Sequence, residues 1–494
     1  MTIDVHDQAA YDALQAKLIP LWRSIERLNT DRQTIVVVPS AEVDFELTPA
    51  QLQAYEERYL FLLFLLRQPR ARMVYVTGQP INPDIVDYYL DVMPGVIASH
   101  ARRRLVLVSP DEASTRPLAE KLLDQSESLA AIRDAIDDPD RAHLVPFMAS
   151  WKDRELAMRL GIPMYGADPK DAHLGTKSSG RKLFAEAGVP HPAGREDLHT
   201  IDELVSAIQD MRADDPSVNR VVVKHNEGVS GYGNVTVDVS DAPDGPAIRT
   251  RLDNVDIEMP GATREQYFEI LDAEGGIVEA MFTAEESRSP SVQLRITPLG
   301  TVELLSTHDQ ILGGDSGQVF IGSRFPADQG YGPQIGEYAL AVGERLAAKG
   351  VIGRFAIDFV VGRNAGAEWD AQAIELNLRK GGTTHPFLTL QFLTDGHFDD
   401  KKGQFFTPQG SNRFYVASDH LNIGRADGMT PRELIDLALI EELHFDQATQ
   451  VGTVFHMLSA LTALGQVGLT SVGSSPQDAQ QRFDRVVQVF GGSA

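Results

Sequence analysis

The stretch that decides the fold is Glu375-Leu376-Asn377-Leu378-Arg379, in which polar and apolar residues alternate. In a β-strand this alternation places the polar side chains on one face and the leucines on the other. An earlier apolar segment, residues 355–361, carries Asp358 in its middle, and the two segments predict a hairpin around residues 362–368. The hairpin brings Asp358, Glu375 and Asn377 to one face, where their oxygens suit Mg²⁺. The alternative is a strand edge with solvated polar residues.

Two lysines upstream lie where an anion site is expected. Lys224 ends the apolar strand 221–224 and is followed by a glycine-rich segment, whose backbone N–H groups can approach phosphate oxygens closely. Lys177 opens a predicted helix over residues 177–187, where free N–H groups favour anions. A glycine-rich turn and a solvated lysine are the alternatives. The predicted phosphate-binding residues of the segment are Glu227, Gly228, Ser230, Gly231 and Gly233.

A further strand, residues 276–282, runs into a linker that contains Glu285 and Glu286. The backbone at Glu279, Ala280 and Met281 can present polar groups to an adenine ring, and a glutamate a few residues later can accept from ribose hydroxyls. Glu285 and Glu286 are both candidates for this contact. An ordinary strand with an acidic flank would give the same pattern.

The rest of the chain alternates between short apolar runs and helical stretches. The runs at 34–38, 73–77, 105–109 and 144–148 are separated by helices, which predicts a parallel α/β sheet. Strands 276–282, 291–297 and 301–306 are predicted to be antiparallel neighbours, followed by a helix over 331–349. Two capping signals, Thr430-Pro431-Arg432-Glu433 and Ser475-Pro476, start helices near the C-terminus.

Composition excludes several classes of protein. With 45 Lys and Arg against 70 Asp and Glu, the 494-residue chain has a formal net charge of −25, which disfavours binding to nucleic acid or anionic membranes. There is no cysteine, so disulfides, thiolate catalysis and cysteine-bound zinc are excluded. The longest apolar run, residues 60–66, is too short for a bilayer, which needs about 20 residues. With no signal-peptide pattern at the N-terminus, we expect a cytoplasmic protein.

The order of these features resembles the ATP-grasp superfamily, which includes D-alanine–D-alanine ligase and biotin carboxylase. The resemblance covers roughly residues 161–390 and implies an α/β fold, α+β in its ATP-grasp part. It implies a pre-ATP-grasp domain (1–160), an ATP-grasp domain (161–395, with a lid at about 216–280) and a mainly helical C-terminal domain (396–494). It also implies that both lysines hold phosphates, that the glycine loop closes over them, and that Asp358, Glu375 and Asn377 hold Mg²⁺ or Mn²⁺. The resemblance further implies that residues 279–281 of the hinge strand contact adenine and that Glu286, seven residues after Glu279, contacts the ribose, with Glu285 as the alternative.

C-terminal segments narrow the resemblance. Gly381-Gly382-Thr383-Thr384-His385-Pro386, the segment 452–457 and the segment 468–473 are similar to the pheganomycin-type peptide ligase family. That family implies a natural-product enzyme that joins a small, unusual amino-acid-like acid to an amine or peptide N-terminus, through an acyl phosphate, with release of ADP and phosphate. A homodimer is also expected. The alternatives are an acid–thiol ligase, a phosphotransferase, or a nucleotide-binding regulatory protein without turnover.

One position departs from the D-alanine ligases. Their oxyanion-stabilising arginine lies two residues before the metal aspartate, where this chain has Ala356. Arg354 points to the same side of the strand, and Arg295 and Arg379 are the other candidates.

Histidines and one serine motif complete the set of candidates. His308 ends a predicted strand and is a catalytic candidate near the acyl phosphate, with a structural role as an equal alternative. The same two interpretations apply to His385 and His456, for which the structural one is a hydrogen-bonded, partly buried histidine. Gly314-Asp315-Ser316-Gly317 matches a serine-protease box, but without a matching histidine segment we interpret it as a loop over the site.

Overall fold

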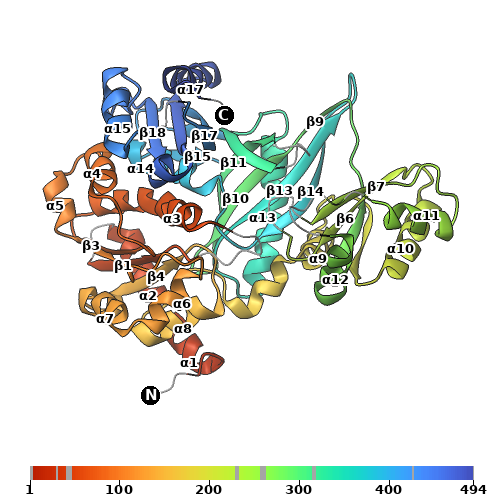
Figure 1. Ribbon diagram of the computed structural model, residues 1–494, viewed down its shortest axis with the longest axis horizontal. Helices are drawn as coiled ribbons and strands as arrows, with labels where there is room; N and C mark the ends of the chain where they lie inside the picture. Colours follow the sequence, from red (N-terminus) through yellow and green to blue (C-terminus); the bar gives the residue numbers. More distant parts are fainter. Residues whose placement is uncertain are drawn as a thin grey trace.

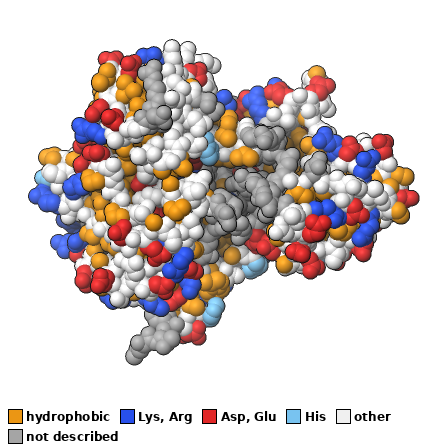
Figure 2. Space-filling model, viewed as in Figure 1, with side chains coloured by type: hydrophobic (Ala, Val, Ile, Leu, Met, Phe, Trp, Pro, Cys, Tyr) orange, Lys and Arg blue, Asp and Glu red, His pale blue; other side chains and the backbone are white. Residues whose placement is uncertain are grey.

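The computed structural model describes residues 4–28, 32–40, 47–228, 233–255, 257, 263–313, 319–424 and 428–492. A large lobe contains both the N-terminal and the C-terminal parts, and a central sheet connects it to a smaller lobe (Figure 1). On the face shown in Figure 2, acidic and basic side chains are interspersed over both lobes rather than gathered into one basic patch. Within the described ranges, no helix combines the length and the apolar character needed to cross a bilayer.

The N-terminal unit is a four-stranded parallel sheet in the order β3-β2-β1-β4, as the sequence predicts. Each strand returns through helical segments, which a parallel sheet requires. The helical segment between the first two strands begins as α3 but continues as the 3₁₀ helix η1. The strands are β1 (Gln33–Val38), β2 (Ala71–Val76), β3 (Leu105–Val108) and β4 (Ala142–Pro146). The helices are α1 (Gln8–Gln15), α2 (Leu18–Leu28), α3 (Pro49–Glu57), η1 (Arg58–Arg67), α4 (Pro83–Val92), α5 (Ala98–Arg102), α6 (Leu118–Asp124), α7 (Ser126–Ala135), η2 (Pro139–Arg141) and α8 (Trp151–Leu160).

The smaller lobe is an antiparallel sheet in the order β5-β8-β6-β7, covered by helices. It begins with β5 (Gly194–Leu198) and α10 (Ile201–Asp214), earlier than the lid boundary expected near residue 216. The predicted pairing of strand 276–282 with strand 291–297 is wrong, because β8 (Gly276–Ala280) pairs with β5 and β6. The remaining elements here are η3 (Pro169–Gly175), α9 (Lys177–Ala187), β6 (Arg220–His225), β7 (Asn234–Asp238), α11 (Gly245–Asp253) and α12 (Arg264–Glu274).

The central sheet is antiparallel and runs β14-β13-β10-β11-β12-β17-β19-β18, with β9 paired to β13. Alternate residues of β10 and β13, including Val292, Leu294 and Ile357, pack against α13 on one face. The opposite face is therefore left for polar side chains. The elements are β9 (Glu286–Arg288), β10 (Pro290–Ile296), β11 (Val302–Gly313), β12 (Val319–Phe325), α13 (Gly332–Ala348), β13 (Gly353–Arg363) and β14 (Asp370–Asn377). The predicted hairpin is confirmed as β13 and β14.

The C-terminal region differs from the mainly helical domain that was predicted. Both capped helices are present, but three strands join the central sheet instead of standing apart from it. β17 pairs with β12 and β19, which both lie far from it in the sequence, so no local pattern identifies its partners. The elements are α14 (Thr384–Thr394), β15 (His397–Asp399), β16 (Gln404–Phe406), β17 (Phe414–Asn422), α15 (Pro431–Ile440), β18 (Gly452–His456), α16 (Ser459–Leu464), β19 (Gln466–Gly473) and α17 (Pro476–Phe490).

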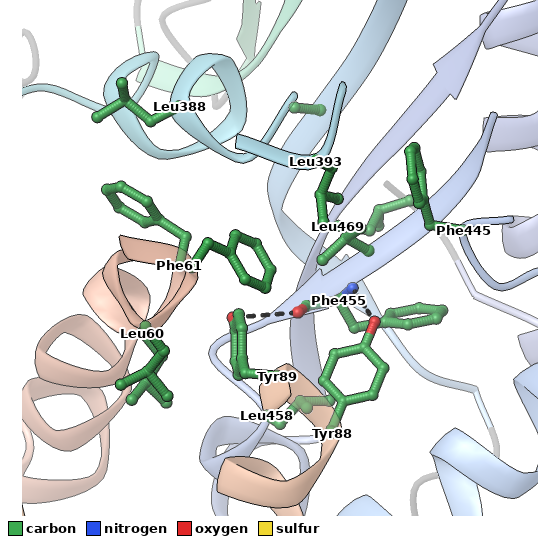
Figure 3. Close-up of a cluster of buried hydrophobic side chains, with 14 of the residues drawn as sticks. Leu60, Phe61, Tyr88, Tyr89, Leu388, Leu393, Phe445, Phe455, Leu458 and Leu469 are labelled. Atoms are coloured by element: carbon green, nitrogen blue, oxygen red, sulfur yellow. Dashed lines mark hydrogen bonds between the residues drawn. The ribbon is translucent and has the colours of Figure 1, made fainter. Parts of the chain in front are cut away.

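One hydrophobic core joins the two ends of the chain. Phe61 of η1 and Tyr89 of α4 belong to the same buried cluster as Phe455 and Leu469 (Figure 3). The Tyr88 hydroxyl accepts from the Phe455 N–H at 2.9 Å, and the Tyr89 hydroxyl donates to the Phe455 carbonyl at 3.2 Å. The N-terminal unit and the added strands thus stabilise each other through shared burial.

Candidate active site

The polar face of the central sheet carries three rows of side chains. Directly paired residues of neighbouring strands point to the same face. The first row is Ser291–Asp358–Glu375 and the second is Gln293–Ala356–Asn377. In the third row Arg295 pairs with Arg354, and Arg379 follows Asn377 by two residues, just beyond the end of β14. Charge therefore changes from negative to positive along β13, over about 13 Å between Asp358 and Arg354.

The first row has the charge and ligand types of a cation site. Asp358 accepts from Gln310 Nε2 at 2.8 Å and from Asn377 Nδ2 at 3.0 Å. Burial and the neighbouring Glu375 carboxylate raise the pKa of Asp358, whereas Arg379 lowers it. Two carboxylates held so close together repel each other, and a divalent cation between them would offset that repulsion. The residues present therefore fit Mg²⁺. The sequence analysis did not identify Gln310, whose hydrogen bond holds the Asp358 carboxylate in place.

Both predicted lysines are buried, and Lys177 lies beside this row. Lys177, at the start of α9, lies 3.4 Å from Glu375 Oε1 and donates to the carbonyl of Gly228. Gly233 has a φ of +81°, a left-handed conformation that favours glycine. Ser230 and Gly231 lie outside the described residues, and Glu227 is exposed. The structure thus brings Lys177 and one end of the glycine segment to the first row, beside Glu375.

Lys224 has a different partner from the one expected. Its ammonium forms a buried ion pair with Glu279, whose second oxygen accepts from Arg181 Nη1 at 3.1 Å. The N–H groups of Ala280 and Met281 donate to Ala193 and Arg220 carbonyls at 2.8 and 2.9 Å. These two donors are already used within the protein, so an adenine contact here would depend on other backbone groups.

Glu286 lies at the far end of the hairpin. It is paired with Arg363 in register and accepts from Arg363 and Arg288, each at 2.8 Å, which lowers its pKa. Arg363 is five residues from Asp358 along β13, or about 16 Å. Glu285 accepts from the Ala365 N–H at 2.9 Å. The structure brings neither glutamate to the lysines, and the ribose contact stays a prediction.

The third row, formed by Arg295, Arg354 and Arg379 and called the arginine row from here on, carries more positive than negative charge. Arg295 is paired with Glu303 and packs on the Trp22 ring at 5.2 Å. Arg354 Nη1 is buried without a hydrogen-bond partner in the described part of the chain, and burial with Arg295 nearby lowers the pKa of Arg354 to about 10. Lys380 is also buried; its ammonium donates to the Pro146 carbonyl, and burial lowers its pKa to about 7. The sequence analysis missed Lys380, which follows the alternating strand in an irregular loop.

His308 pairs in register with Ser291 and therefore extends the first row, but its side chain is buried rather than open to solvent. Its Nε2 contacts the Tyr415 hydroxyl at 2.7 Å, and aromatic rings of Phe325 and Phe387 surround it. Burial lowers the pKa of His308 to about 3, so the ring is neutral at physiological pH. This position favours the structural alternative. His385 and His456 are both buried and in contact with each other, whereas the segment 314–317 lies outside the described residues.

Comparison with known proteins places this geometry in context. The family described as IQCH-like, ATP-grasp matches residues 170–256 and 262–401. The L-propargylglycine–L-glutamate ligase of Streptantibioticus cattleyicolor is 32% identical over 444 residues, which cover 88% of each chain. The IQ motif-containing protein H of Danio rerio is 22% identical, and its match covers 95% of this chain but 49% of that protein.

Solved structures share the fold at low sequence identity. The biotin carboxylase domain of the 2-oxoglutarate carboxylase from Hydrogenobacter thermophilus, solved with ADP and magnesium, has a TM-score of 0.55 at 12% identity, covering 93% of this chain and 90% of that one. The N5-carboxyaminoimidazole ribonucleotide synthetase from Thermus thermophilus has a TM-score of 0.51 at 12% identity, covering 92% and 98%.

Proposed function

This chain belongs to the ATP-grasp family of carboxylate–amine ligases, and from that membership we propose that it joins a small amino-acid-like carboxylate to an amine through an acyl phosphate. The γ-phosphoryl group of ATP passes to an oxygen of the substrate carboxylate, and ADP leaves. The amine then attacks the acyl carbon, phosphate departs, and an amide remains. No protein nucleophile is required.

The observation that carries this proposal is the order of the three rows on the sheet. Phosphoryl transfer to a carboxylate gathers negative charge between two anions. The carboxylate row with Asn377 would hold Mg²⁺, which neutralises phosphate oxygens when it is bound. Lys177 lies beside this row and would hold the phosphates, with Lys224 as the second phosphate lysine. The arginine row begins where the metal row ends, so Arg354 and Arg379 are positioned to orient the carboxylate under attack.

The relative from Streptantibioticus cattleyicolor suggests where to look for substrates. Its name specifies L-propargylglycine and L-glutamate. We propose that this chain takes an acid of the same class, a small L-amino acid or a close analogue, and an amino acid or peptide as the amine. Within the described residues Arg295 forms an ion pair with Glu303, and no carboxylate lies within ion-pair distance of Arg354 or Lys380. A substrate carboxylate would supply the missing negative charge.

The reaction can be tested in two stages. ADP release is measured for a panel of acids that includes L-glutamate and propargylglycine, with and without amines, and the products are identified by mass. Hydroxylamine added in place of the amine would trap an acyl phosphate as a hydroxamate. We expect ATP-dependent hydroxamate with the correct acid. ADP release that requires an acid but never yields hydroxamate or amide would refute the ligase proposal.

A matched pair of variants tests the arginine row. Arg354→Met should lower kcat/KM by about 100-fold, because it removes a preorganised cation from the transferring group. Arg345→Met changes an exposed arginine in the last turn of α13 and should leave activity unchanged. Equal activity of the two variants would remove Arg354 from the proposed site.

A further inference from the structure

Three buried side chains outside the nucleotide site converge on one point. His385 is the second residue of α14, Asp419 lies in β17 and His456 ends β18. Nε2 of His385 and Nε2 of His456 are 2.9 Å apart, and Asp419 Oδ1 lies 3.0 Å from the first and 2.7 Å from the second. The relative exposures of the three residues are 2%, 6% and 3%, so bulk solvent does not fill the space between them.

With an ionised Asp419, no arrangement of protons on the two rings satisfies this triangle. If both rings carry hydrogen on Nε2, both can donate to Asp419, but the two N–H groups then face each other at 2.9 Å. If only one ring does so, the lone pair of the other ring faces a carboxylate oxygen at 3.0 Å or less. Either arrangement leaves one close repulsive contact in a buried place. A cation at the centre would accept all three lone pairs at once.

The spacing also suits a particular kind of ion. An octahedral first-row metal with bonds of about 2.1 Å has adjacent ligand atoms about 3.0 Å apart, whereas tetrahedral zinc needs about 3.4 Å. The measured 2.7–3.0 Å corresponds to one face of an octahedron. Two imidazoles with one carboxylate favour Mn²⁺, Fe²⁺, Co²⁺, Ni²⁺ or Zn²⁺ over Mg²⁺ and Ca²⁺.

The surroundings hold the three groups in place. Arg58 Nη1 binds the other oxygen of Asp419 at 2.8 Å, which orients the carboxylate and leaves Oδ1 facing the histidines. Gly468 pairs with His456 in register, and a Cβ at this position would lie 2.1 Å from His456 Nε2. The glycine therefore provides the space in which His456 reaches across β19 to Asp419.

We propose that His385, Asp419 and His456 form a site for a first-row transition-metal ion, separate from the all-oxygen magnesium site. The ion ties α14 to β17 and β18, three elements that come from distant parts of the chain. Because α14 follows the loop 381–383 at the end of the arginine row, the ion also fixes the position of that loop. This inference does not depend on the proposed ligase reaction.

Metal analysis of the full-length protein tests the site. Protein grown with manganese, iron and zinc, and purified without chelator, should contain about one transition-metal ion per chain by mass spectrometry. His456→Gln should lose that ion, whereas Glu375→Gln, a change in the magnesium site, should retain it. Metal below about a tenth of an equivalent in the wild type, after growth with these metals, would overturn the proposal.

Thermal unfolding and Co²⁺ absorption give a second readout that needs no variant. After chelator treatment, adding Mn²⁺, Co²⁺ or Zn²⁺ in excess should raise Tm by about 2–5 °C. Co²⁺ should also produce a visible absorption band that Mg²⁺ does not abolish. If these ions change neither Tm nor the spectrum, the triad is a metal-free hydrogen-bonded clamp and the proposal fails, whether or not His456→Gln folds.

Discussion

Replacing Lys380 with methionine tests how much a buried positive charge beside Arg354 lowers the free energy of unfolding. Burial lowers the pKa of Lys380 from 10.5 to about 7, so the unfolded chain binds a proton that the folded protein releases. One pKa unit corresponds to about 1.4 kcal/mol, so this lysine costs about 5 kcal/mol of stability below pH 7 and about 3 kcal/mol at pH 8. The cost fades as the pH rises toward 10.5, and stability therefore increases with pH over this range.

Lys380→Met removes that cost but leaves the Pro146 carbonyl without its donor, a loss of about 1–3 kcal/mol. The loss of the donor does not vary with pH, so the pH dependence isolates the charge. We expect the stability difference between variant and wild type to fall by about 1.4 kcal/mol per pH unit between pH 7.5 and 9.5.

Urea unfolding followed by tryptophan fluorescence at three pH values measures this slope. Lys402→Met is the control, because the Lys402 side chain is 64% exposed and its removal should give a difference independent of pH. A difference for Lys380→Met that stays constant from pH 7.5 to 9.5 would refute the assignment of a buried lysine with a lowered pKa. Adding the substrate acid should weaken the slope, because a bound carboxylate favours the charged ammonium.

Three further outcomes are expected. Glu375→Ala should abolish Mg·ATP turnover while the circular dichroism spectrum stays that of the wild type, and Asp370→Ala, an exposed change on the same strand, should leave turnover intact. Burial and Glu375 raise the pKa of Asp358, so its contribution to the stability of the metal-free protein is present at low pH and lost as the pH rises through that pKa. Asp358→Asn should therefore raise Tm at pH 8 but hardly at pH 5. Equal shifts of Tm at the two pH values would contradict this cause. The Ser475 hydroxyl accepts from the Asp478 N–H, so Ser475→Ala should cost about 1 kcal/mol in urea unfolding, with no change in activity.

Local patterns in the sequence predicted that the side chains of the proposed magnesium site would lie together. Glu375 and Asn377 are two residues apart on one strand, and Asp358 lies on the strand before it, so alternation and a short hairpin are enough to bring them together. Lys177 was assigned from its place at a helix start. These features depend on neighbours in the sequence, where periodicity is informative.

Features that depend on distant pairing were not predictable in the same way. Alternation marks residues 276–280 as a strand but does not say which sheet the strand joins, and its partners proved to be β5 and β6. The partners of β17 and β19 are likewise set by tertiary packing. Lys380 and the triad of His385, Asp419 and His456 depend on contacts between residues that lie 34 to 234 positions apart in the sequence, which no local pattern encodes.

The core shared by the two ends of the chain has a consequence for synthesis on the ribosome. Phe61 and Tyr89 emerge early, but Phe455 and Leu469 emerge nearly 400 residues later. At about 5–20 residues per second, the apolar face of η1 and α4 waits roughly 20–80 s for its partner. We expect nascent chains that stop before β17 to bind chaperones and to be degraded quickly, so a truncation that removes β17, β18 and β19 should also prevent the N-terminal unit from accumulating in folded form.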